Sequence, residues 1–252
     1  MSRDLSLLST MVYPGRFIIL GRDETGEQGI VVYGITGRSP LSQARKLELI
    51  GDRIMTKPTD QDVLKKGNPE LLIYPAIIFS RGIAVSNGSQ TPSIDEQLGK
   101  TAEPKRILSR ALRNWDYEPD PPIFTPRIGG CLLSSFEAAL GIVRRGEDGS
   151  SQKTVFDFVL SPGQGKMIST YSGKNEDTLR PFSSRPLELT VVQGTAKDLA
   201  EAVYKALEPK NGGQDLRVAV ACVFSRSLRK EASGIFIINR VSRMTKSHGQ
   251  SG

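Results

Sequence analysis

Two arginines stand at or just after the end of an apolar segment, where their side chains could face a cleft. Arg38 follows Gly37 and Arg45 follows a Gln-Ala pair, close behind the Val- and Ile-rich run that ends at Ile35. A guanidinium keeps its charge and can hold a phosphate through two parallel N–H groups. Both could instead be solvated surface arginines, so they predict an anion site only if the fold brings them together.

A tyrosine and a glutamate add groups that can transfer protons. Tyr74 interrupts an otherwise apolar segment. Its phenol could donate to an oxygen that becomes negative, or it could be a core aromatic with a bonded hydroxyl. Glu118 precedes Pro119, which favours extended backbone and holds the carboxylate outside a helix. Beside arginines this carboxylate could take or relay a proton, whereas alone it would be a solvated loop acid.

The remaining polar motifs give weaker signals. The pair Asn87-Gly88 follows a predicted strand and is common in turns. Residues 163–166 (GQGK) resemble a phosphate loop but lack its first glycine and its Ser/Thr, so a hairpin tip is expected. The one histidine, His248, lies in a polar tail, and Cys131 and Cys222 are too far apart for a zinc site or a disulfide framework. We therefore predict no metal and no other cofactor.

The elements that must position these residues are mostly strands. Apolar segments alternate with Gly-rich or polar turns, which is typical of paired antiparallel strands. Strands are predicted at 16–20, 29–35, 71–79, 83–86, 128–133, 139–143, 154–160, 187–192, 218–224 and 234–240. Helices are predicted at 94–99, 104–115 and 196–207, the last between an N-cap at Thr195 and a stop at Pro209. Segments 144–153 and 211–215 are expected to be exposed loops.

These elements predict an α+β fold with mainly antiparallel sheets. We find no linker and no change of composition that would divide the chain, so one domain is expected over residues 1–244, followed by a polar tail at 245–252.

Composition excludes several classes of protein. Of the 252 residues, 38% are hydrophobic and 24% are charged, which is typical of a folded globular protein. No apolar run reaches the roughly 18 residues of a membrane span, and the N-terminal segment lacks the apolar core of a signal peptide. A cytoplasmic protein without a membrane partner is therefore expected. The net charge of +7 favours anionic partners. Because basic residues are spread along the chain without a nucleic-acid-binding motif, a discrete phosphate pocket is expected, with no nucleic-acid partner.

Four segments, taken in order, resemble one known family. They are YPGR at 13–16 with its continuation through 31–45, IYPAIIFSRGIAVSNGSQT at 73–91, DYEPDPPIFTPRIGG at 116–130 and ISTY at 168–171. Together they resemble the archaeal-type inosine monophosphate (IMP) cyclohydrolases and their bacterial relatives. The resemblance covers about residues 12–171, with extra material near 51–67 and 144–166. After Tyr171 nothing aligns, and no role is assigned there.

The resemblance implies a fold and a reaction. The fold is a four-layer αββα sandwich like that of the N-terminal-nucleophile hydrolases. A processed nucleophile is not expected, because Ser2 is followed by a polar lead-in. In the reaction, the carboxamide nitrogen of 5-formamido-imidazole-4-carboxamide ribonucleotide attacks the formyl carbon, and loss of water gives IMP. An amide nitrogen is a poor nucleophile, so the site must align it, relay protons and stabilise an oxyanion, and it needs no metal.

Roles for individual residues also follow from the resemblance. The residues expected to be catalytic are Tyr74, Glu118 and Arg38. The residues expected to bind the substrate, a purine ribonucleotide, are Arg16, Arg45, Asn87, Asp116 and Arg127. Self-association into a homo-oligomer is implied as well.

Three other functions stay open on the sequence. A non-catalytic nucleotide-binding relative would keep the arginines and lose the proton relay, whereas this chain retains Tyr74 and Glu118. An amidohydrolase of the N-terminal-nucleophile type would need a Ser, Thr or Cys at a mature terminus. A nonspecific nucleic-acid-binding protein would lose affinity steeply with salt. The cyclohydrolase is the leading hypothesis because it accounts for all four segments.

Overall fold

The fold consists of two antiparallel sheets that pack face to face. The computed structural model describes residues 5–240 except 61, 63, 64, 66–68, 192, 193, 211, 227 and 229–233. Among these residues, one sheet contains, in spatial order, β11 (Leu187–Thr190), β10 (Gln164–Ser169), β1 (Arg16–Arg22), β2 (Gly29–Thr36), β12 (Arg217–Ser225) and β13 (Ile235–Asn239). The other contains β3 (Arg45–Ile50), β4 (Arg53–Pro58), β5 (Tyr74–Phe79), β6 (Ile83–Ser86), β7 (Arg127–Leu132), β8 (Glu137–Arg145) and β9 (Ser151–Val159). The predicted α+β class with mainly antiparallel sheets is confirmed.

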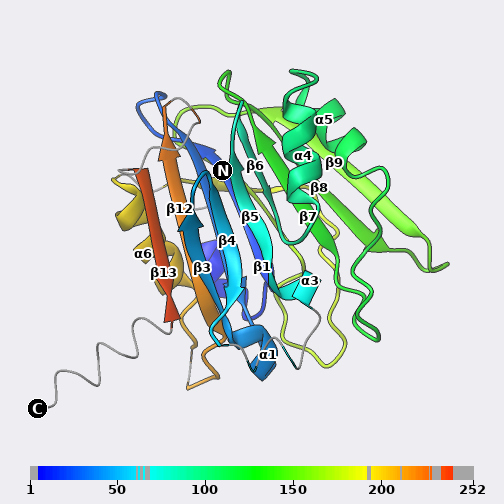
Figure 1. The fold of residues 1–252 in the computed structure, drawn as a ribbon. Coiled ribbons are helices and arrows are strands. Elements are labelled where there is room, and N and C mark those ends of the chain that lie inside the picture. The colour runs from blue at the N-terminus through cyan, green and yellow to red at the C-terminus, as the bar shows by residue number, and fades with distance from the viewer. Residues whose placement is uncertain are drawn as a thin grey trace, which may run out of the picture.

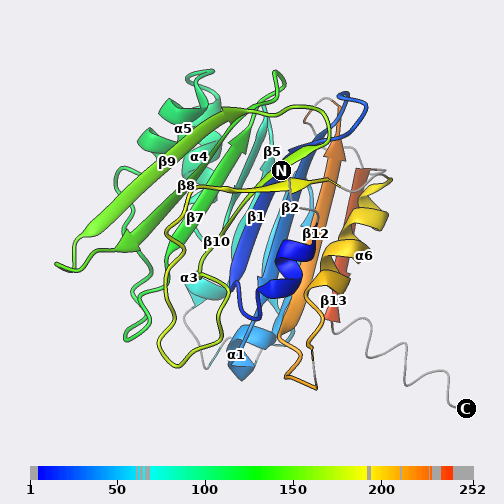
Figure 2. The same ribbon diagram turned by 180° about the vertical axis from the view of Figure 1, so that it is seen from behind.

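Helices cover the outer faces of both sheets (Figures 1 and 2). The 3-10 helix η1 (Leu5–Thr10) and α6 (Ala196–Ala206) pack on the six-stranded sheet, where Leu199 and Val203 join the apolar cluster. Helices α4 (Thr91–Leu98) and α5 (Pro104–Ala111) pack on the seven-stranded sheet through Ile94 and Ile107. A third cluster fills the space between the sheets. Because many of these strands are buried on both faces, their sequences are continuously apolar.

Strand direction gathers the site residues at one end of the sandwich. Successive strands of the second sheet run in opposite directions, so β3, β5 and β7 all begin at the same end of the sheet. The residues at which these three strands begin are Arg45, Tyr74 and Arg127. In the other sheet β1 begins with Arg16, beside the end of β2. The short helices α1 (Pro40–Gln43) and α3 (Pro69–Leu72) lie at the same end (Figure 1).

Some predicted boundaries were wrong. The predicted loop at 144–153 is shorter than expected, because β8 continues to Arg145 and β9 begins at Ser151, which leaves residues 146–150 between them. The adjoining ends of β8 and β9 carry charged and polar residues, and β9 is the exposed edge strand of its sheet, so no apolar pattern marks these positions. The GQGK segment was predicted as a hairpin tip, but Gln164 to Lys166 open β10 and only Gly163, with φ +73°, lies in the turn. Strands β3, β4 and β10 were not predicted.

Other predictions hold or lie outside the described residues. Thr195 caps α6 as predicted, and its side chain and that of Asp198 form a reciprocal capping box. The helix predicted at 104–115 ends at Ala111. Ser2 and the tail with His248 lie outside the described residues.

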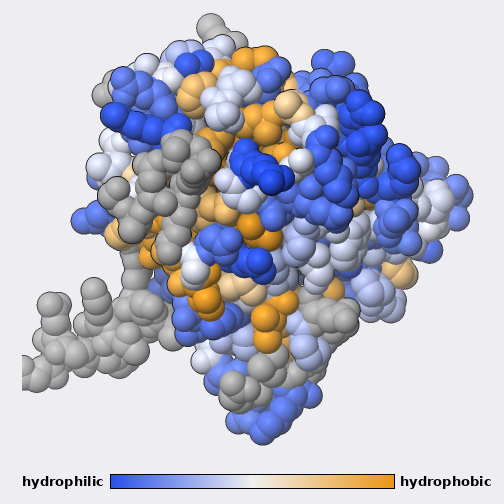
Figure 3. Space-filling model, turned by 45° about the horizontal axis from the view of Figure 1, so that its top comes forward, coloured by the Kyte–Doolittle hydropathy of each residue, from blue (hydrophilic) through white to orange (hydrophobic). Residues whose placement is uncertain are grey.

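One face of the molecule is mainly polar. On the face shown in Figure 3, hydrophilic side chains predominate and apolar atoms form patches between them. The exposed large hydrophobic residues in the described part are Val12, Ile50, Ile73, Ile123 and Val159. Among the described residues, no helix has the length and hydropathy that a membrane span requires.

Candidate active site

A buried ion pair lies at the end of the sandwich where β1 begins. The Nη2 atom of Arg16 is 2.8 Å from Oε1 of Glu118, and the two side chains are 8% and 5% exposed. The main chain fixes the loop that carries the glutamate, because Glu118 N donates to the carbonyl of Thr125 at 2.8 Å. Thr125 is held in turn by the Asp120 carboxylate and by the hydroxyl of Tyr171. Glu118 is therefore a buried, positioned carboxylate and not a solvated loop acid.

Two tyrosines from opposite sheets meet in the same interior. The hydroxyl of Tyr33, on β2, is 2.9 Å from the hydroxyl of Tyr74, the first residue of β5. Both rings are fully enclosed, at 0% and 2% exposure. The charge of Arg16 acts on both phenols, which places the tyrosine pair in the electrostatic neighbourhood of the ion pair.

Two further arginines surround the carboxylate. Arg45 and Arg127 are both buried, and the charges of both act on Glu118. Arg127 is fixed by the carbonyl of Asp116, at 2.8 Å from its Nε, and by Oε1 of Gln90, at 3.2 Å from its Nη1. Arg45 is different, because its Nε and Nη1 atoms are buried and have no hydrogen-bond partner in the described structure.

Unpartnered polar atoms concentrate at this end. Besides the two atoms of Arg45, Nε of Arg16 and Oγ1 of Thr56 are buried without a partner in the described structure. Thr56 lies directly opposite Tyr74 in the pairing of β4 with β5, so both side chains are on the same face of the sheet. A buried donor without a partner costs about 1–3 kcal/mol, so such atoms are expected where a ligand completes the hydrogen bonds.

Burial and neighbouring charges have opposite effects on the pKa values of several groups in this cluster. Burial raises the pKa of the Glu118 carboxyl, and the charges of Arg16 and Arg127 offset only part of that rise. Burial also disfavours the charge of Arg16, but Glu118 and the neighbouring tyrosines together more than compensate, so the pKa of this guanidinium lies well above its ordinary value. Burial lowers the pKa of Arg127. Burial raises the pKa of the Tyr171 hydroxyl to about 12. The site therefore combines fixed positive charge with a carboxyl that takes up a proton more readily than an exposed one.

Three predicted site residues stand apart from this cluster. Arg38 is half-buried at the rim, where Nη1 donates to the carbonyl of Glu176 at 2.8 Å and the guanidinium lies 5.2 Å from the centre of the Tyr13 ring. The Asn87 amide bonds main-chain atoms of the loop ahead of β7 and of β7 itself. Asp116 contributes its main-chain carbonyl to Arg127, and its side chain is exposed. The structure thus brings together Arg16, Arg45, Tyr74, Glu118 and Arg127.

Sequence reasoning missed several residues that contact this group. Tyr33 shows the same signal as Tyr74, a tyrosine within an apolar strand, and this signal could have identified it. Tyr33 was not identified because it lies within the strand, four residues before the turn glycine Gly37, and not at a strand end. Gln90 carries no comparable signal, since only its contact with Arg127 indicates a role.

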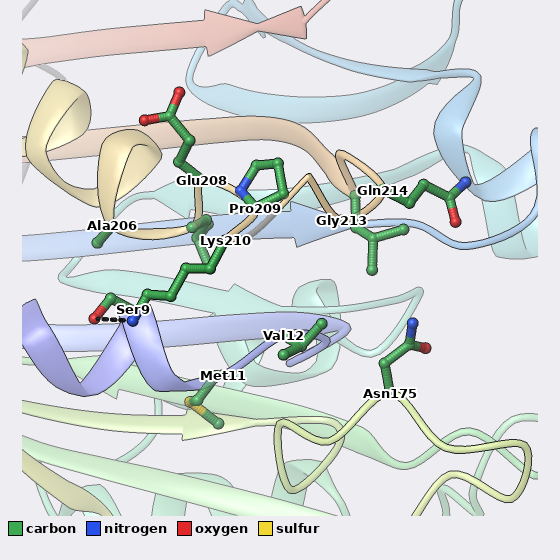
Figure 4. A pocket seen from close by; sticks show the side chains of 12 residues that line it. Ser9, Met11, Val12, Asn175, Ala206, Glu208, Pro209, Lys210, Gly213 and Gln214 are labelled. Atoms are coloured by element: carbon green, nitrogen blue, oxygen red, sulfur yellow. Dashed lines mark hydrogen bonds between the residues drawn. The ribbon is translucent and has the colours of Figure 1, made fainter.

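The pocket in Figure 4 is a separate feature of the surface. It has a volume of about 330 Å³ and lies among η1, the end of α6 and the segment that follows α6. Its lining includes Met11, Val12, Leu207 and Leu216, and Lys210 Nζ reaches Oγ of Ser9 at 3.4 Å across its edge. None of the predicted site residues lines this pocket.

The fold and the site together define a class of protein. Two antiparallel sheets enclose arginines, an ion-paired carboxylate and a pair of phenols, groups that can bind an anion and transfer protons. The family model that describes an "IMP cyclohydrolase-like protein" matches residues 13–226. The chain belongs to this family.

Similar proteins carry the same name. The IMP cyclohydrolase of Methanopyrus kandleri is 30% identical over 173 residues, which cover 68% of this chain and 80% of that protein. The IMP cyclohydrolase of Methanosphaera stadtmanae is 27% identical over 206 residues, 80% of this chain and 87% of that protein. The family match continues beyond Tyr171, where sequence inspection aligned nothing, and thus includes α6 and β12.

Proposed function

We infer that this protein is an IMP cyclohydrolase, which closes the purine ring of 5-formamido-imidazole-4-carboxamide ribonucleotide with loss of water. Membership of the family supports the activity. One structural observation supports the location of the site: Glu118, paired with Arg16, lies in the same buried cluster as Tyr74 and the unpartnered Nε and Nη1 atoms of Arg45.

The reaction requires three things that this cluster can supply. The carboxamide nitrogen loses a proton as it attacks the formyl carbon, and the Glu118 carboxylate is a base held in place for that proton. Negative charge develops on the formyl oxygen, and the Tyr74 hydroxyl is a donor for it. The oxygen leaves as water after it receives two protons, one from the carboxamide nitrogen through Glu118 and one from the formamido nitrogen, as its bond to carbon breaks and the C=N bond of the ring forms. The surrounding arginines hold the anionic substrate, and burial strengthens each of these electrostatic interactions.

The cluster carries more positive than negative charge, which suits a ribonucleotide because its phosphate is anionic. Three buried guanidiniums, those of Arg16, Arg45 and Arg127, face one paired carboxylate, while Asp120 is occupied by Thr125. A phosphate or a heterocycle oxygen could accept from Nε of Arg45 or from its Nη1, two donors that point to different sides of the guanidinium. Such an acceptor would remove the cost of the unpartnered donor that it engages.

The proposal extends to the architecture. Helices outside two face-to-face sheets support an αββα sandwich of the N-terminal-nucleophile hydrolase kind, in one domain over residues 1–244, from a cytoplasmic protein that self-associates. The chemistry proposed for Glu118 and Tyr74 uses internal side chains and needs no terminal nucleophile.

Nucleotide binding can be tested separately from turnover. We expect IMP to raise the melting temperature and inosine, which lacks the phosphate, to have little effect. At a hundredfold excess over its Kd, a ligand adds about 2.7 kcal/mol to the free energy of unfolding. Stabilisation by IMP without any ring closure would favour the non-catalytic relative, and no stabilisation by IMP would contradict the proposed site.

Replacing Arg45 should separate stability from binding. Arg45→Met removes two buried N–H groups that have no partner, so the free protein should be as stable as the wild type or more stable by up to about 2 kcal/mol. The melting temperature would then rise by about 2–4 °C per kcal/mol, whereas stabilisation by IMP should largely disappear. The control is Arg53→Met on the neighbouring strand, where the arginine is 51% exposed. Unchanged stabilisation by IMP in Arg45→Met would exclude Arg45 from the site.

Arg38 at the rim should affect binding more than turnover. We expect Arg38→Ala to raise KM by about 10- to 100-fold, the effect of losing a hydrogen bond to a charged group worth about 1.5–3 kcal/mol. The value of kcat should change little, because Arg38 lies outside the buried cluster and contacts Tyr13 and Glu176. Steady-state kinetics would check this, and an unchanged KM would remove Arg38 from the substrate contacts.

A further inference from the structure

The hydroxyl of Tyr33 contacts that of Tyr74, the proposed donor to the oxyanion. Tyr33 itself has no role in the reaction described above. It belongs to β2, in the sheet opposite β5, where it pairs with Ile18 and Ala221. Its hydroxyl reaches across the interior to within 2.9 Å of the Tyr74 hydroxyl. We propose that Tyr33 is a positioning residue, which donates its proton to Tyr74 and thereby aims the proton of Tyr74 at the reacting oxygen of the substrate. This inference rests on the proposed function.

The number of available protons sets the direction of this hydrogen bond. A phenol has one proton to donate and lone pairs to accept with. When two hydroxyls share one hydrogen bond, one must donate and the other accept, and the geometry between Tyr33 and Tyr74 permits either direction. Tyr74 can donate to a substrate oxygen only if its proton is not used for Tyr33. The productive arrangement is therefore Tyr33 to Tyr74 to substrate.

The Tyr33 hydroxyl is protonated, as this arrangement requires. Burial and the neighbouring Tyr74 raise the pKa of the Tyr33 hydroxyl well above its ordinary value, and the charges of Arg16 and Arg45 offset only part of the rise. Tyr33 thus retains its proton for donation. A hydroxyl that accepts a hydrogen bond also becomes a better donor, because hydrogen bonds in a chain polarise one another. Tyr33 would then strengthen the contact that Tyr74 makes with the oxyanion.

The ring of Tyr33 has a second, structural function that can be separated from the hydroxyl. It is 0% exposed and belongs to the apolar cluster between the sheets. A phenylalanine at this position keeps the ring and removes only the oxygen. Tyr33→Phe therefore tests the hydroxyl with little change in packing, and Tyr204→Phe on α6, in the outer cluster, is the matched control.

The test is a double-mutant cycle of Tyr33→Phe and Tyr74→Phe, read out as kcat and KM for ring closure by the full-length protein. In the wild-type background we expect Tyr33→Phe to lower kcat by about 3- to 10-fold, the range for one neutral hydrogen bond, with KM unchanged. In the Tyr74→Phe background it should change kcat by less than twofold, because the group that it positions is gone. Tyr204→Phe should leave kcat unchanged.

The possible outcomes are distinct. Equal effects of Tyr33→Phe in both backgrounds would overturn the positioning role and indicate a general structural effect, and no effect in the wild-type background would also overturn it. If the variant unfolds at assay temperature, the cycle is measured at a temperature where circular dichroism shows it folded, and the same comparison decides. Absence of turnover by the wild type would overturn the proposed function itself, whatever Tyr33 does.

Discussion

Glu118→Gln should lower kcat for ring closure by about 10²- to 10⁴-fold, the range for loss of a general acid–base group. Glutamine has nearly the same shape as glutamate and can still accept a hydrogen bond from Arg16, but it cannot take up the carboxamide proton. KM should change much less than kcat, because the proton is transferred in the transition state and not in the bound complex. Initial rates over a range of substrate concentrations would check this.

The same variant gives a pH test. If Glu118 acts as the base, it must be ionised, so activity falls as the pH drops through its pKa. Burial raises the pKa of this carboxyl, so the acid limb of kcat/KM should be centred above the usual range for a glutamate. This limb should disappear from the residual activity of Glu118→Gln. Glu96→Gln, in an exposed pair with Lys100, is the control and should leave the profile unchanged. Wild-type rates in Glu118→Gln would exclude a catalytic role for this carboxylate.

Tyr74→Phe should lower kcat by about 10²- to 10³-fold, as removal of one donor to an oxyanion does in other enzymes. The variant keeps the aromatic ring in the core between the sheets and removes the hydroxyl that lies 2.9 Å from Tyr33. Stability should fall by about 1–3 kcal/mol, because the buried Tyr33 hydroxyl loses its partner. A melting curve would therefore show a folded protein under conditions in which turnover is nearly lost.

The split between kcat and KM separates two explanations for Tyr74. An oxyanion donor acts mainly in the transition state, so KM should stay within a fewfold of the wild-type value. If instead KM rises and kcat is retained, the hydroxyl contributes to ground-state binding, and a different group must stabilise the oxyanion.

Much of the fold could be predicted from the sequence because most strands are buried on both faces. The runs that became β1, β2 and β12 are continuously apolar and lie between turn residues, so their positions were evident. Strands β3 and β4 were missed because their residues alternate between buried and exposed and include several charges. For the same reason, the charged ends of β8 and β9 were mistaken for a loop.

The residue types of the site could be predicted from the sequence, but their arrangement in space could not. The sequence could indicate Arg45 and Glu118 as candidates, yet they are 73 positions apart and burial of the carboxylate depends on how the loop before β7 folds. The pairing of Tyr33 with Tyr74 crosses between two sheets, and no local pattern encodes which residues meet there. Asn87 shows the opposite case, because its amide is engaged by the main chain in the structure, as its turn pattern alone would suggest.

The most direct test of the proposed function is an ultraviolet assay of ring closure. Purified protein is mixed with 5-formamido-imidazole-4-carboxamide ribonucleotide in a buffer with chelator, and formation of the hypoxanthine chromophore is followed beside a control without protein. We predict catalytic turnover to IMP by the wild type and its near-complete loss in Glu118→Gln. A wild-type rate equal to the control without protein would contradict the assignment.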